Sequence, residues 1–88
     1  MFHAEYSKRF DREYKRFCNS NPRMAEKIDE LRKDTLEHPT EGLGKPERLR
    51  HLGGNVWSRH VDKKNRLRYS IEGNIIYFER CRGHYKDH

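Results

Sequence analysis

The sequence has no long hydrophobic run and few of the residues that build a large apolar core. Only 32% of its 88 residues are hydrophobic, whereas 39% are charged. No run of apolar residues is long enough to cross a bilayer, and the first fifteen residues lack the apolar segment of a secretion signal. These absences predict a single small domain over residues 1–88 that is cytoplasmic, has a thin core and does not associate with membranes.

Cysteine is also scarce. Cys18 and Cys81 lie far apart and form no CxxC pair, so the sequence indicates neither a zinc ribbon nor a disulfide framework. We expect two reduced thiols.

Positive charge, by contrast, is abundant. The formal net charge is +6, and ten aromatic residues stand among the basic ones. Such a balance fits nucleic acid or an acidic protein better than a neutral metabolite, and charge alone does not choose between those two partners.

Two amphipathic helices are predicted in the first half of the chain. After Ser7, which can act as an N-cap, Phe10, Tyr14 and Phe17 recur at helical spacing over about three turns. A second helix begins at Asn21-Pro22, ends near Leu36, and has a buried stripe formed by Met24, Ile28 and Leu31. Residues 1–5 allow a short edge strand before the first helix.

The second half of the chain predicts a sheet. Residues 38–46 contain two prolines and two glycines and form an irregular connection, after which Glu47 to Leu52 starts the sheet. Residues 55–85 then read as a three-stranded antiparallel meander, with turns at 62–65 and at Gly73-Asn74. Around residues 66–71 apolar side chains alternate with cationic or polar ones. The predicted fold is therefore α+β, with two antiparallel N-terminal helices packed on one face of an antiparallel sheet.

The predicted sheet carries residue types that suit RNA cleavage. Attack by a 2′-hydroxyl needs a base, an acid for the departing 5′-oxygen, and cations on the phosphorane oxygens. Glu47 stands among arginines at positions 48, 50, 59, 66, 68, 80 and 82, and His84 with Tyr85 closes the last strand. Histidine titrates near neutrality and suits the acid role, and no metal or other cofactor is required. Tyr85 or Trp57 could stack on a splayed base.

Each of these residues also has an ordinary structural interpretation. Glu47 and His84 could be surface residues, and Trp57 could anchor the core. The arginines could form the solvated face of an antiparallel sheet. Residue pattern alone leaves both interpretations open.

The motifs favour the first interpretation by resemblance. GKPERL, WSRH, NRLRY and CRGHY follow one another between Gly44 and Tyr85. Together with the run from Lys27 they resemble the YoeB/Txe family of toxins, within the RelE/ParE superfamily of type II toxin–antitoxin systems. The resemblance implies a small α+β domain that cuts mRNA on the ribosome without a metal. It also implies silencing by an acidic cognate antitoxin of the YefM/Axe type.

Residue roles follow from the same resemblance. Glu47 resembles the general base, Arg66 the arginine that holds the scissile phosphate, His84 the general acid, and Tyr85 a residue that positions substrate. Contacts to mRNA or ribosomal RNA are expected from Lys45, Arg50, Arg59, Arg68 and Arg82. The chain departs from the family at His60, where a second basic residue is frequent, at Gly83, and in the extension after Tyr85.

The sequence is compatible with two functions. The first is a ribosome-dependent mRNA endoribonuclease (mRNA interferase) that inhibits translation. The alternative is a catalytically inactive basic binding module that acts with its antitoxin in operon repression, contacting operator DNA only through that complex. A homodimer is compatible with either function.

Overall fold

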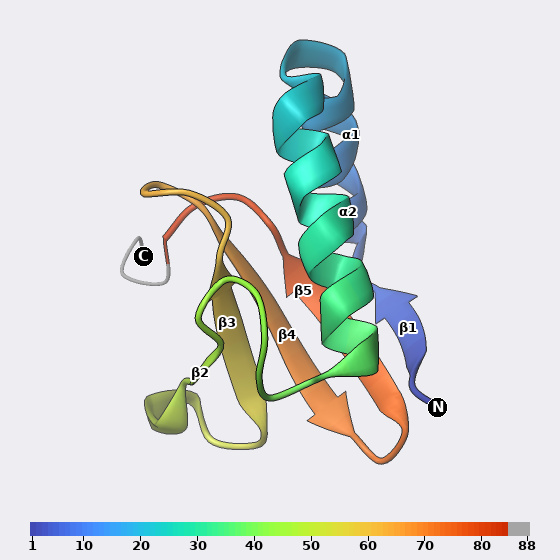
Figure 1. Ribbon diagram of the computed structural model, residues 1–88, viewed down its shortest axis with the longest axis vertical. Coiled ribbons are helices and arrows are strands. Elements are labelled where there is room, and N and C mark those ends of the chain that lie inside the picture. Colours follow the sequence, from blue (N-terminus) through green and yellow to red (C-terminus); the bar gives the residue numbers. More distant parts are fainter. Residues whose placement is uncertain (85–88) are drawn as a thin grey trace.

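The computed structural model describes residues 1–84 as five strands and two α-helices (Figure 1). In chain order they are β1 (His3–Tyr6), α1 (Lys8–Ser20), α2 (Pro22–Glu37), β2 (Glu47–Arg48), the short 3-10 helix η1 (Arg50–Leu52), β3 (Val56–His60), β4 (Arg66–Glu72) and β5 (Ile75–Arg80). Both α-helices cover one face of a sheet with strand order β1-β5-β4-β3-β2. The predicted α+β class and the helices on one sheet face are confirmed.

The helices begin where their capping residues predict. The Ser7 side chain accepts the Phe10 N–H at 2.9 Å, which starts α1. Asn21 caps α2 by accepting the Met24 N–H at 3.4 Å, and Pro22 occupies the first turn, where it sacrifices no helical hydrogen bond.

The core lies between the helix pair and the sheet. Five of its fully buried members come from α2, β4 and β5, namely Ile28, Leu67, Tyr69, Ile76 and Phe78. Burying one such aliphatic or aromatic side chain contributes about 1.5–3 kcal/mol. Trp57 packs against this cluster, as the structural interpretation expected.

Two expectations about the sheet are corrected. β1 is an edge strand, but it spans His3–Tyr6 and pairs with β5 in parallel, so the sheet is not wholly antiparallel. A short strand therefore comes before the helices, which cross over from β1 to the rest of the sheet. The first strand of the second half covers only Glu47–Arg48. After it Leu49 turns into the core at 2% exposure, and η1 leads away from the sheet to the Gly53-Gly54 turn.

The strand register defines a second sheet face, turned away from the helices, which we call the outer face. Glu47 is paired with Ser58 and Ser58 with Arg68, while His60 is paired with Arg66. Since successive side chains on a strand point to opposite faces, these residues share a face opposite Arg59 and Leu67. The outer face thus holds three of the residues that the motifs single out.

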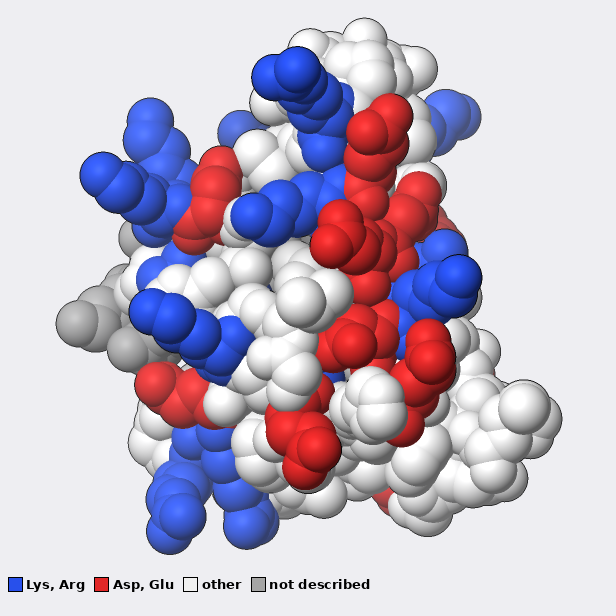
Figure 2. All heavy atoms as spheres, viewed as in Figure 1, with Lys and Arg blue, Asp and Glu red and all other residues white. Residues whose placement is uncertain are grey.

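Charge is segregated over the molecule. In Figure 2 acidic side chains run in a stripe along α2, and Lys and Arg side chains project from the side of β2 and β3. Among residues 1–84 no helix is long and apolar enough to cross a membrane.

Candidate active site

The outer face brings three of the predicted residues, Lys45, Glu47 and Arg66, to one end of the sheet. Arg66 opens β4 directly opposite His60, the last residue of β3, and Glu47 lies on the neighbouring edge strand β2. Lys45 precedes that strand, and its φ of +50° is the only left-handed one at a non-glycine residue within residues 1–84. Glu47, Lys45 and His60 are exposed, so a ligand can reach them.

Arg66 is held firmly by the turn before it. Its Nη1 donates to the Asp62 carbonyl at 2.8 Å and to the Asn65 carbonyl at 3.3 Å, and the residue is only 8% exposed. Nε is buried without a hydrogen-bond partner among residues 1–84. The backbone carbonyls therefore fix the guanidinium, and no carboxylate of residues 1–84 forms an ion pair with it, which suits a phosphate ligand.

Gly83, the residue before His84, is hydrogen-bonded to Arg66 and so places His84 near it. The Arg66 N–H donates to the Gly83 carbonyl at 2.9 Å, and the Gly83 N–H donates to Asn65 Oδ1 at 2.9 Å. Gly83 has a φ of +89°, a conformation that a side chain would strain. This pair of bonds ties the CRGH segment to the start of β4. Tyr85 and the extension that follows it lie outside the described residues.

The segment after β5 is also anchored from its other side. Arg80 donates from Nη2 to the Arg82 carbonyl at 2.8 Å. The Glu13 carboxylate of α1 accepts the backbone N–H groups of Cys81, at 2.8 Å, and Arg82, at 3.2 Å. The position of His84 therefore depends on contacts from α1 as well as from β4.

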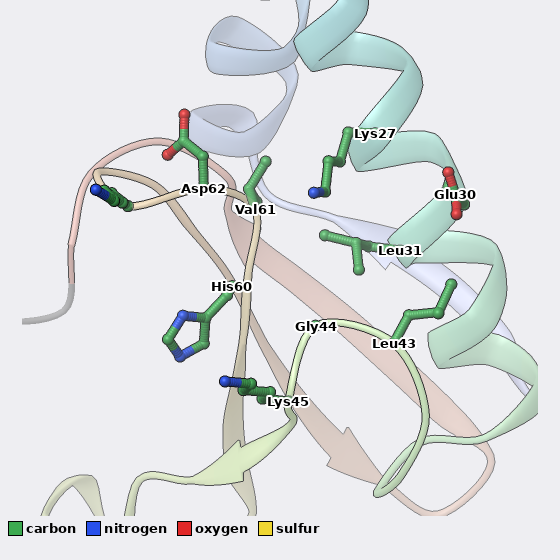
Figure 3. Close-up of a pocket in the computed structure, with 10 residues that line it drawn as sticks. Lys27, Glu30, Leu31, Leu43, Gly44, Lys45, His60, Val61 and Asp62 are labelled. Carbon is green, nitrogen blue, oxygen red and sulfur yellow. The ribbon is translucent and has the colours of Figure 1, made fainter.

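His60 lies where the charges of the site meet. Partial desolvation lowers the pKa of its imidazole, and the positive charges of Arg66 and Lys45 lower that pKa further, whereas Glu47 opposes them. His84 acts on the same ring. Figure 3 shows the His60 ring and the Lys45 amine projecting to the same side, away from α2. Arg66, Lys45, Glu47 and His84 are thus each close enough to His60 to act on it electrostatically.

His60 is the residue that the motifs failed to single out. It appeared only as a departure from the family pattern, although its place opposite Arg66 puts it at the centre of the site. Strand alternation could have identified it, because His60 follows Arg59 on the same strand and must therefore point to the opposite face of the sheet.

Arg59 does not have the position expected of an RNA contact, and that prediction is wrong. The residue is 0% exposed, on the helix side of the sheet. Its guanidinium donates to Asp34 Oδ2 at 2.6 Å, to the carbonyls of Leu43 and Glu41 at 2.9 Å, and to the His38 carbonyl. Arg59 therefore organises the connection that leads to Lys45 and Glu47, and has no surface to offer a phosphate.

The remaining predicted RNA contacts occupy three different places. Arg68 lies on the outer face in the row that contains Glu47 and donates from Nε to Glu79 Oε1 at 2.9 Å. Arg50 is exposed at the first position of η1, in the connection between β2 and β3. Arg82 is exposed on the side of α1. Only Lys45 and Arg68 of this group lie beside the candidate catalytic residues.

A cavity of about 460 Å³ opens next to the site (Figure 3). Its floor includes Leu31, Leu43 and Val61, and Lys45 and His60 stand at its border with the outer face. Within residues 1–84 no group of three or more His, Cys, Asp or Glu side chains gathers in a way that could hold a metal ion.

Comparison with known proteins assigns this arrangement to a family. Residues 6–85 match the YoeB-like toxin of bacterial type II toxin–antitoxin systems. Toxin YoeB of Escherichia coli K12 is 38% identical over 73 residues, which are 83% of this chain and 87% of that toxin.

Solved structures agree with the sequence relatives. The YoeB dimer from Staphylococcus aureus superposes with a TM-score of 0.87 at 32% identity, over 96% of this chain and 98% of that one. Toxin from the heterotetrameric YoeB–YefM complex of S. aureus gives 0.83 at 33% identity, over 97% and 99%. This chain therefore belongs to the YoeB-like toxins of bacterial type II toxin–antitoxin systems, within the RelE superfamily.

Proposed function

We propose that this toxin is a ribosome-dependent endoribonuclease that cleaves mRNA through its own 2′-hydroxyl. Glu47 takes the proton from the 2′-hydroxyl, and the resulting oxygen attacks the adjacent phosphorus. His84 donates a proton to the departing 5′-oxygen. The products are a 2′,3′-cyclic phosphate, which can open to a 3′-phosphate, and a free 5′-hydroxyl.

The cations around this pair stabilise the transition state. Arg66 is fixed by carbonyl groups and keeps its charge for the phosphorane oxygens. Lys45 adds a second positive charge from the neighbouring loop, and Tyr85 positions the substrate. His60, whose pKa is lowered, is neutral near pH 7 and contributes hydrogen bonds without further charge. The acid and the base are protein side chains, so the reaction needs no metal.

One observation carries the proposal: the outer face gathers a carboxylate, two histidines and a fixed arginine at one end of the sheet. A module that only bound nucleic acid would need the cations and not a paired acid and base. Ribosome dependence is supported by the exposure of Glu47, since an open sheet face does not by itself hold a flexible RNA strand in line for attack.

The antitoxin partner is proposed from the family. A short acidic protein of the YefM type would cover the cationic outer face, as YefM forms a heterotetramer with YoeB in S. aureus. Operator DNA would be contacted only through such a complex. A toxin homodimer is a further assembly, in view of the S. aureus YoeB dimer.

The test uses purified toxin, ribosomes carrying a defined message, and the same message free in solution. We expect cleavage of the ribosome-bound message to leave a 2′,3′-cyclic phosphate or a 3′-phosphate, and cleavage of free RNA to be much slower. Equal rates on both substrates would refute ribosome dependence. Products with a 5′-phosphate would refute attack by the 2′-hydroxyl.

A further inference from the structure

A second group of arginines lies outside the candidate active site, along α1. Arg9, Arg12 and Arg16 recur on one side of the helix, and Arg82 from the segment after β5 faces them across a hollow of about 220 Å³. We call these four residues the α1 track. All four are exposed, and among residues 1–84 the acidic side chain that lines the hollow is that of Glu13.

The positive charge of the α1 track is largely uncompensated. Both oxygens of Glu13 are engaged, one by the backbone of Cys81 and Arg82 and the other by Arg9 at 2.9 Å. Within residues 1–84 no ion pair joins Arg12, Arg16 or Arg82 to a carboxylate. Neighbouring cations without counter-charges repel one another, so an anion that binds here is favoured by all of them.

The α1 track is continuous with the candidate active site. A second hollow, of about 430 Å³, shares Arg9, Glu13 and Arg82 with the first and extends past Lys64 to Gly83. Gly83 is bonded to Arg66 and precedes His84. The side of α2, in contrast, carries the acidic stripe of Figure 2. A polyanion leaving the active site therefore meets attraction towards α1 and repulsion over α2.

We propose that the α1 track binds the phosphates of the RNA strand on one side of the cut. The inference rests on the proposed function and names a second contact region for the same substrate. Guanidinium groups bind phosphate through two parallel hydrogen bonds. Arg9 to Arg16 span about 10 Å of helix axis, so these side chains can meet successive phosphates. RNA is favoured over an acidic peptide because every lining residue of the two hollows within residues 1–84 is polar, charged or glycine, and none offers an apolar site for an anchoring side chain.

The test compares two double variants that each remove two positive charges from exposed helix positions. Arg12→Gln/Arg16→Gln changes the α1 track, and Arg23→Gln/Lys33→Gln is the matched control on α2. The probe is uncleavable 2′-O-methyl RNA, as a twelve-nucleotide strand and as a trinucleotide that occupies only the active site. Dissociation constants are measured over a range of salt concentrations. Because the probe is not cut, the result is independent of the catalytic proposal, which the cleavage assay tests separately.

The affinity for a single strand falls with salt, and each phosphate contact that a substitution removes makes the slope of log affinity against log salt less steep by about 0.7. For the longer strand we expect the slope to become less steep by about 1.4 in Arg12→Gln/Arg16→Gln and to stay unchanged in the α2 control. Neither variant should change the dissociation constant of the trinucleotide. Equal losses in both variants would overturn the proposal, because they would report net charge only. An unchanged slope in the α1 variant would overturn it as well. So would loss of affinity for polyglutamate with RNA affinity retained, which would assign the track to an acidic protein.

Discussion

At the scale of single residues, His60 is the most informative titratable group. Desolvation and the charges of Arg66 and Lys45 lower its pKa, so the folded chain binds a proton at this ring less readily than the unfolded chain does. As pH falls through the ordinary histidine value of about 6.5, the unfolded state takes up that proton first. The contribution of His60 to stability is therefore present above this pH and is lost below it.

We accordingly expect acidification to destabilise the natural chain more than a His60→Gln variant. Urea unfolding at pH 7.5 and pH 5.5 measures the difference, and the variant serves as its own control for the other five histidines. If both proteins lose the same free energy of unfolding, or if the natural chain loses less, His60 is not held in the environment described.

The catalytic pair gives a second prediction at this scale. Replacing Glu47 or His84 by alanine removes the proposed base or acid and should slow cleavage of ribosome-bound message by roughly 10²–10⁴-fold. Single-turnover rates measure the loss, and circular dichroism checks that each variant is folded. Glu72→Ala, on the exposed end of β4, is the control that should cleave at the natural rate. A folded Glu47→Ala variant with full activity would remove Glu47 from the mechanism.

At the scale of elements, the connection between α2 and β2 decides where Lys45 and Glu47 stand. It has no regular structure, and its carbonyl groups at residues 38, 41 and 43 accept hydrogen bonds from the buried Arg59. Asp34 completes the arrangement. Desolvation would raise the pKa of its carboxyl, but the Leu43 N–H and the Arg59 guanidinium outweigh that effect and hold the pKa below its usual value. The Arg59–Asp34 ion pair and its hydrogen bonds thus fix the conformation of a connection that has no regular secondary structure.

Breaking this ion pair should therefore be costly. Arg59→Met removes the guanidinium that donates to the Asp34 carboxylate and to the carbonyl groups of the connection, and we expect a loss of about 3–5 kcal/mol in the free energy of unfolding. Arg68→Met is the matched control, because it breaks an ion pair with Glu79 whose two side chains are 26% and 27% exposed, and should cost about 0–1 kcal/mol. Urea unfolding curves decide the matter, and equal costs would contradict the structural role of Arg59.

The elements also explain which features could be predicted from the sequence. Ser7, Asn21 and Pro22 act locally, so both helix starts follow from neighbouring residues. The parallel pairing of β1 with β5 joins residues more than 70 positions apart, and no local pattern specifies it. The strand predicted for residues 47–52 covers only two residues. The loose alternation of apolar and polar residues suggested a longer strand, but Leu49 is buried in the core and η1 follows it.

Part of the candidate site could likewise be predicted from the sequence. Glu47, Arg66 and His84 were found through motifs, and the structure brings them to one end of the outer face. Arg59 was wrongly predicted to contact RNA, because a motif does not specify which face of the sheet a residue occupies. Its pairing with the buried Leu67 puts it on the helix side. A buried arginine also runs against the usual exposure of charged residues, and here Asp34 makes the burial possible.

At the scale of the whole molecule, charge segregation and the open outer face suit an acidic partner. A segment that folds as it binds can place carboxylates near Arg66 and Arg68 and move His84 without entering the site itself. Displacement of a catalytic group by about 1 Å is enough to lower the rate by about 10²-fold. We expect an acidic protein encoded beside this toxin to form a tight complex, to shift the NMR signals of His84, and to suppress cleavage to that extent. A purified complex that cleaves at the rate of the free toxin would contradict this prediction.

The central claim is that the outer face cuts mRNA on translating ribosomes. The most direct measurement is to induce the natural chain and the His84→Ala variant in bacterial cells and to map the 5′ ends of all messages. We expect new 5′-hydroxyl ends within translated regions and growth arrest for the natural chain, and neither effect for His84→Ala at equal protein level. New ends spread equally over untranslated RNA, or growth arrest by His84→Ala without new ends, would contradict it.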